Sequence, residues 1–248
     1  TLNGTAGNIG IGKNVFSALT SGSDCTVIGG EAGKALTTAG GNSFFGVNCG
    51  KAVTSGDYNI LIGSAAGDAF DTEGHNIGIG KDALGGAVAG GEQNIAIGTN
   101  AGDELTSGDS NVIIGFDAGH SVTTAFETVL IGLNAGSELT TGQNNICIGA
   151  RAGDELTTGV GYVCIGSDSM GGATTENYSV AIGSNTCGGT GNTFSGSELN
   201  VAMNVGALGV LTSGQNNIAI GFQAGASCTT GGNNTFVGGS YTGQDLTT

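Results

Sequence analysis

Apolar and polar positions along this chain repeat with a period of 17 residues. The pattern Asn-Ile-x-Ile-Gly stands at Asn59–Gly63, Asn94–Gly98 and Asn217–Gly221. Numbered from its closing glycine, the unit recurs in fourteen copies, with longer steps of 18 residues before Gly98 and 21 before Asn204, which once replaces the glycine. Such regularity predicts a repeat architecture in which each unit is one structural module.

The repeat predicts short strands joined by tight corners. Its consensus, N-I-x-I-G-x-N/D-A-G-x-x-L-T-T/S-G-x-x, contains a strand, a glycine-bounded corner, a Leu-Thr step and a second turn. No segment carries a 3.6-residue apolar stripe long enough for a helix, and the glycine density opposes one. Strands this short are unstable alone, so each unit must stack on the next. We therefore predict an all-β fold, a parallel β-solenoid (β-roll) of fourteen 17-residue repeats.

The position before the closing glycine is apolar in every repeat, and we expect it to line the solenoid core. Side chains of a strand alternate between faces, so this position and the one two residues earlier point to the same side. Recurrent leucines such as Leu36 and Leu105 would form the opposite wall, and recurrent alanines such as Ala66 and Ala101 a narrow corner. The predicted core positions are Ile11, Ile28, Phe45, Ile62, Ile79, Ile97, Ile114, Ile131, Ile148, Ile165, Ile182, Met203, Ile220 and Val237.

The position between these two inward columns carries no charge in any repeat, although on a monomeric solenoid it would face water. A continuous apolar stripe indicates a surface covered by another chain. A closed cyclic oligomer is the simplest assembly, and we predict an intimately packed homotrimer. The predicted oligomer interface consists of Val27, Phe44, Leu61, Ala96, Ile113, Leu130, Cys147, Cys164, Ala181, Ala202, Ala219 and Phe236.

The repeats divide the chain into three segments. Regular solenoid repeats are expected over 1–187, an insertion loop over 188–199, and further repeats over 200–248 that end uncapped. Solenoids need caps to prevent growth at their edges. We therefore expect the chain to continue in a longer polypeptide or to stack end to end.

Two motifs resemble known fibrous proteins. The segments Tyr178–Gly183 and Asn94–Gly98 resemble the repeats of trimeric autotransporter adhesin heads. The longer 17-residue unit is similar to repeats in the shafts of phage tail fibres and related viral fibres. The resemblance implies a parallel homotrimer whose strands face a common axis, with a host surface receptor as a possible partner.

Composition and charge narrow the possible partners. The chain has 52 glycines, no proline and a net charge of −15, which disfavours binding to nucleic acid and anionic membranes. No apolar run approaches the roughly 18 residues of a transmembrane helix, so membrane insertion is not expected. The resemblance to fibre and adhesin repeats implies a location on a virion surface or outside the cell.

The cysteines and asparagines are interpreted as structural. Cys147 and Cys164 share one column, but the other four cysteines scatter over four columns, which favours free, buried thiols over a disulfide pattern. Asparagine fills the position before the strand in ten repeats, for example at Asn59 and Asn217. Stacked amides of this kind can form a hydrogen-bonded ladder.

No pattern of catalytic residues is present. Acidic pairs such as Asp103-Glu104 recur at equivalent turns. We interpret them mainly as solvated charge, with Ca²⁺ between chains as an alternative and no other cofactor expected. The two histidines, His75 and His120, lack serine or cysteine partners, so we predict that the protein is not an enzyme.

The sequence therefore predicts a structural fibre or stalk segment of a phage or viral tail fibre that extends or presents a receptor-binding surface. Three alternatives remain open: the head or stalk of a bacterial trimeric surface adhesin, an ice-binding solenoid, and a self-assembling extracellular filament. The ice-binding alternative depends on threonines that recur at one phase, such as Thr37 and Thr54. They are followed directly by Thr or Ser, which is typical of turns.

Overall fold

A computed structural model describes residues 7–86, 91–172, 178–188, 198–243 and 245. The chain forms two compact units, Thr1–Ala125 and Phe126–Thr248. Most of the predicted insertion loop, residues 189–197, lies outside the described part of the chain. Among the described residues, no helix has the length and hydropathy needed to cross a bilayer.

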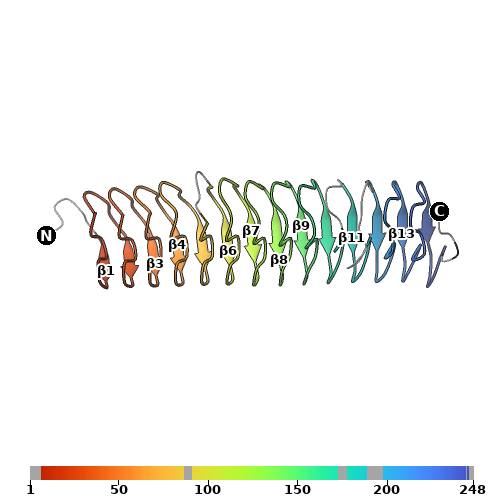
Figure 1. Cartoon of the computed structure of the whole chain (residues 1–248), viewed down its shortest axis with the longest axis horizontal. Coiled ribbons are helices and arrows are strands. Elements are labelled where there is room, and N and C mark those ends of the chain that lie inside the picture. Colours follow the sequence, from red (N-terminus) through yellow and green to blue (C-terminus); the bar gives the residue numbers. More distant parts are fainter. Residues whose placement is uncertain (1–6, 87–90, 173–177, 189–197, 244, 246–248) are drawn as a thin grey trace. The chain divides into compact units, whose positions relative to one another are not determined.

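Each unit is a parallel β-solenoid with one three-residue strand per coil (Figure 1). The first unit contains β1 (Ile9–Ile11), β2 (Thr26–Ile28), β3 (Ser43–Phe45), β4 (Ile60–Ile62), β5 (Ile77–Ile79), β6 (Ile95–Ile97) and β7 (Val112–Ile114). The second contains β8 (Val129–Ile131), β9 (Ile146–Ile148), β10 (Val163–Ile165), β11 (Val180–Ile182), β12 (Val201–Met203), β13 (Ile218–Ile220) and β14 (Thr235–Val237). The predicted fold class is confirmed.

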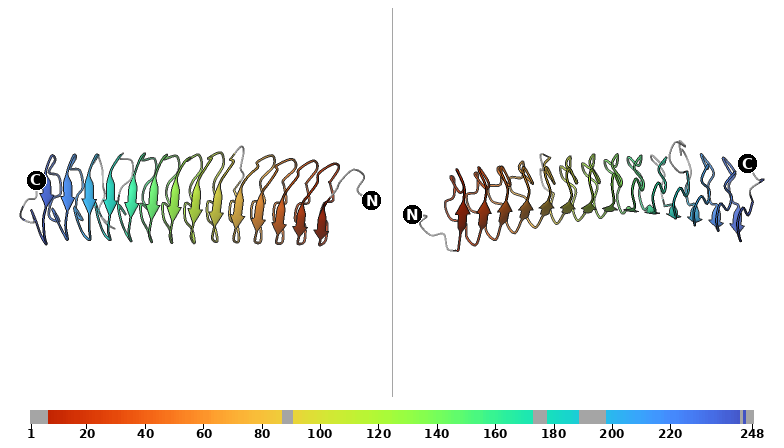
Figure 2. Two further views of the ribbon diagram at one scale, coloured as in Figure 1. Left: turned by 180° about the vertical axis from the view of Figure 1, so that it is seen from behind. Right: turned by 90° about the horizontal axis from the view of Figure 1, so that it is seen from below.

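Neighbouring strands within a unit pair in register, so each repeat position forms a column (Figure 2). Leu61 of β4, for example, lies opposite Gly78 of β5. The hydrogen bonding continues around the corners. The amide of Thr106 donates to the carbonyl of Thr123 over 2.9 Å, one coil further along. Stacking therefore satisfies backbone groups around much of each coil and not only in the strands.

In most coils, the glycine that closes the strand is required by both conformation and space. Gly63 has a φ of 139°, a backbone region that residues with a Cβ atom avoid. A Cβ at Gly63 would lie 2.1 Å from the carbonyl oxygen of Gly80 in the next coil. Asn204, the one replacement, has a φ of 90°. The 17-residue period therefore depends on a corner where coils approach backbone to backbone.

The structure reverses the predicted inner and outer faces of the strands. From β2 to β14, the middle residue of each strand is buried in the coil and the two flanking residues point outward. In β4, Leu61 is 0% exposed, whereas Ile60 is 40% and Ile62 39% exposed. The predicted leucine wall and alanine corner are confirmed, since residues such as Leu105 and Ala101 are fully buried. One strand side chain per coil fills the remaining interior.

Both sets of strand residues therefore change their roles. The positions predicted as core lie on the outer face, exposed or half-buried: Ile11, Ile28, Phe45, Ile62, Ile79, Ile97, Ile114, Ile131, Ile148, Ile165, Ile182, Met203, Ile220 and Val237. The positions predicted as oligomer interface are buried in their own coil: Val27, Phe44, Leu61, Ala96, Ile113, Leu130, Cys147, Cys164, Ala181, Ala202, Ala219 and Phe236. Because the chain itself already covers these twelve, they cannot form a surface between chains.

Candidate functional surfaces

The outer face of the strands, called here the strand face, consists of the first and third residues of every strand. These positions hold Ile, Val, Thr, Ser, Phe or Met and never a charged residue. Large exposed side chains on this face include Ile9, Ile11, Phe45, Ile60 and Ile62 in the first unit and Ile146, Ile218, Ile220 and Val237 in the second. Each unit thus presents two parallel columns of mainly branched apolar residues to the surroundings.

The strand face is extended by the corner residue that follows the closing glycine. In several coils this residue is large, apolar and exposed, as at Val47, Phe116, Leu133, Val205 and Phe222. Isolated exposed apolar residues are ordinary, but contiguous rows of them mark interaction surfaces. The strand face is therefore the strongest candidate for a surface that contacts another molecule.

The buried asparagines form the predicted ladder. The Oδ1 of Asn42 accepts a hydrogen bond from the amide of Asn59 over 2.8 Å, and the Nδ2 of Asn59 donates to the carbonyl of Glu73 over 2.8 Å. In the second unit, the amide of Asn217 donates to Oδ1 of Asn200 over 3.0 Å. These amide groups serve the stacking of coils, which confirms the structural interpretation.

The threonine column also joins coils. The hydroxyl of Thr37 donates to the carbonyl of Thr54 over 2.9 Å, and that of Thr212 donates to Thr229 over 2.9 Å. These hydroxyl protons therefore point along the stack and not outward to water. The threonines thus contribute to the stacking of coils, and ice binding stays a prediction.

All six cysteines are free and buried, as predicted. Cys147 and Cys164 are partners in the register of β9 and β10, and the Cys164 thiol lies 3.3 Å from the sulfur of Met170. Burial raises the pKa of Cys49 to about 12 and that of Cys164 well above its ordinary value. Thiols with such pKa values remain protonated and are poor nucleophiles at neutral pH. They act as small apolar core residues.

The acidic turns bring His120 close to two carboxylates. His120 lies 3.8 Å from Asp103 and 3.9 Å from Glu104, measured from its Nδ1 and Nε2 atoms to the carboxylate oxygens. Burial raises the pKa of Asp103, an effect that the His120 charge opposes. Within the described residues, no group of three or more His, Cys, Asp or Glu side chains could hold a metal ion. Calcium bound between chains stays a prediction.

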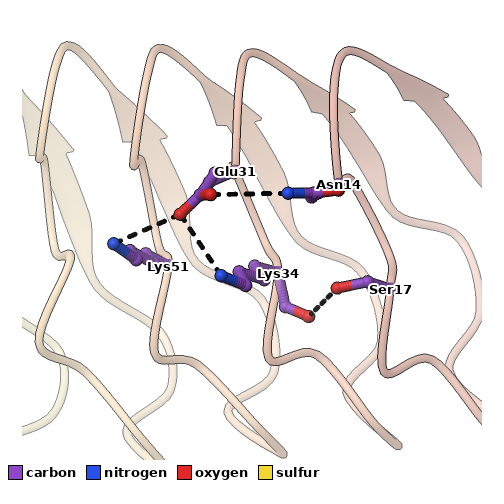
Figure 3. Close-up of polar contacts among 5 residues, drawn as sticks. All are labelled: Asn14, Ser17, Glu31, Lys34 and Lys51. Atoms are coloured by element: carbon purple, nitrogen blue, oxygen red, sulfur yellow. Dashed lines mark hydrogen bonds and ion pairs between the residues drawn. The ribbon is translucent and has the colours of Figure 1, made fainter.

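A cluster that was not predicted from the sequence lies on the first coils (Figure 3). It consists of Lys34, Lys51 and Glu31 and is called here the lysine cluster. Lys34 and Lys51, from neighbouring coils, both approach Oε2 of Glu31, over 3.4 and 3.3 Å. Asn14 donates to Oε1 of the same carboxylate over 3.4 Å, and the Ser17 hydroxyl donates to the carbonyl of Lys34 over 3.1 Å. Hydrogen bonds from Lys51 and then Lys34 lower the pKa of Glu31.

The lysine cluster borders an open groove of about 570 Å³. The groove is lined by Ser17, Ala18, Lys34, Ala35, Lys51, Ala52 and Asp68. The repeat register contained the signal for this site. Lys34 and Lys51 are 17 residues apart, and Ser17 and Asp68 continue the same column on either side.

Comparison of the chain with protein-family models, curated protein sequences and solved structures gave no match.

Proposed function

We propose that this chain is a non-enzymatic structural segment of a fibre, such as the shaft of a phage or viral tail fibre, that extends or presents a receptor-binding surface. The observation that carries the proposal is the stacking itself. Backbone amides, asparagine amides and threonine hydroxyls all bond from one coil to the next. Such a chain resists bending within each unit because deformation would break many hydrogen bonds together.

The proposed assembly uses the strand face in place of the interface predicted from the sequence. All fourteen outward side chains of the first unit's seven strands are exposed or half-buried, so the strand face offers a partner a continuous uncharged surface. An uncharged face also suits copies of a chain whose net charge is −15, since elsewhere such copies repel. A closed homotrimer would cover this face on every copy.

Light scattering of the purified chain tests the assembly. We expect a mass of three chains for the wild type. The Ile60→Asp/Ile62→Asp double variant places two charges on the strand face and is expected to lower the mass while circular dichroism stays unchanged. Ser55→Asp is the matched control, because Ser55 is exposed at a turn away from the strand.

A monomeric wild type would refute the assembly, and a trimeric double variant would refute the surface assigned to it. Species of large and variable mass would instead favour the filament alternative. The adhesin alternative shares the trimer and differs in origin. Thermal hysteresis in the absence of assembly would instead favour the ice-binding alternative, with the strand face as the ice-binding surface.

A further inference from the structure

The groove beside Glu31 combines three chemically different surfaces within four successive coils. Ala18, Ala35 and Ala52 supply its apolar lining. Two ammonium groups, those of Lys34 and Lys51, stand along one column of the groove, and the Asp68 carboxylate continues that column. A volume of about 570 Å³ is within the range of small-molecule sites and exceeds that of a single inorganic anion.

The two lysines are already arranged around an anionic oxygen. Both Nζ atoms lie within 3.4 Å of Oε2 of Glu31, although the lysines belong to different coils. Each ammonium group has three N–H donors, and the contact with Glu31 uses only part of them. Both side chains are more than 40% exposed, so the remaining donors are accessible to a ligand in the groove.

The charge distribution along the chain makes this position unusual. The chain has five Lys and Arg residues, and Lys13, Lys34 and Lys51 lie in the first three coils, with Lys34 and Lys51 at equivalent positions and Lys13 four positions earlier in its repeat. Against a net charge of −15, an anionic ligand would be repelled from most of the surface and attracted to these coils.

We propose that this groove binds a saccharide that carries a carboxylate. The ligand carboxylate bridges the ammonium groups of Lys34 and Lys51, opposite Glu31. Sugar hydroxyls donate hydrogen bonds to the Asp68 carboxylate, and an apolar face of the sugar ring lies on Ala35 and Ala52. A simple anion fits less well, because Asp68 would repel it without receiving a hydrogen bond in return. The site deepens the proposed function and rests on it for its biological role, the recognition of an acidic surface glycan by a fibre.

Calorimetric titration of the full chain with trigalacturonic acid tests the site, with the neutral trisaccharide maltotriose as the ligand control. We expect the acidic trisaccharide to bind and maltotriose to bind at least about tenfold more weakly, since only the former has a carboxylate for the lysines. Lys34→Gln/Lys51→Gln keeps most of the side-chain length and should weaken binding at least about tenfold. Lys81→Gln is the control, because Lys81 pairs with Asp82 outside the groove.

Asp68→Asn distinguishes a saccharide from a simple anion by the sign of its effect. Loss of hydroxyl hydrogen bonds should weaken saccharide binding, whereas a general anion site would bind more tightly once a negative charge is removed. Tighter binding in Asp68→Asn, equal loss in Lys81→Gln, or no binding at about 10 mM ligand would overturn the proposal. A trimeric wild type that does not bind would overturn only the site, so its failure is distinguishable from that of the fibre function.

Discussion

Leu61→Ala measures directly which face of a strand is inside. Leu61 is 0% exposed, and its partner in the next coil is Gly78, which has no side chain to fill a vacated space. On another side, Gly67 lies so close that a Cβ there would be 2.7 Å from Cδ1 of Leu61. Two bordering glycines leave little that can relax into the cavity. We therefore expect a cost in the upper part of the range for buried leucines, about 4 kcal/mol.

The matched control is Ile62→Ala in the same strand. Ile62 is 39% exposed on the strand face, so its truncation removes less buried area and leaves no enclosed cavity. We expect a cost of about 1 kcal/mol. The free energy of unfolding is measured by urea titration at a protein concentration where light scattering reports a monomer. Hydrogen exchange of the β4 amides supplies a local measurement in case the solenoid does not unfold in one step.

A double variant tests the cavity itself. Gly78→Ala alone should destabilise, because its Cβ would lie 3.0 Å from Cδ2 of Leu61. In the Leu61→Ala background the same methyl group enters the vacated space and should restore about 1 kcal/mol. A larger cost for Ile62→Ala than for Leu61→Ala would refute the assignment of faces. Additive losses in the double variant would refute the proposed cavity.

Three further predictions concern the corner, an acidic turn and the thiols. Gly29→Ala should lower the free energy of unfolding by at least about 3 kcal/mol, since φ is 145° and the new Cβ would meet the carbonyl oxygen of Gly46. Gly30→Ala is the control and should be neutral in the same urea titration, because the space around Gly30 is open. Burial raises the pKa of Asp154 to about 6, above its unfolded value, so the folded protein loses stability as pH rises from about 4 to above 6. Asp154→Asn should therefore raise the melting temperature more at pH 8 than at pH 4, and an equal effect at both values would contradict this cause. Iodoacetamide at pH 8 should label no cysteine in the native chain and all six after denaturation, because burial protects thiols such as Cys49; rapid native labelling would contradict their burial.

Part of the candidate chemistry could be predicted from the sequence because it depends on the repeat register alone. Asparagines 17 residues apart, such as Asn42 and Asn59, must stack once the coils stack, so their ladder followed from the period. The same register places Lys34 beside Lys51. The approach of Glu31 to both lysines could not be predicted, because it depends on how a corner with positive φ turns the carboxylate along the coil surface.

The sequence by itself determined the period, the strands, the glycine corners and the parallel solenoid, because each follows from local chain geometry repeated at a constant spacing. Only the tertiary structure decided which side of each strand is inside. Because side chains alternate along a strand, its first and third residues share one face. Strands such as Ile60–Ile62 are apolar on both faces, so the sequence does not determine which face is buried. The narrow interior of the coil determines which face is buried. Leucines and alanines from the other walls occupy most of that space, one strand side chain per coil completes it, and the paired branched residues are left on the outer surface.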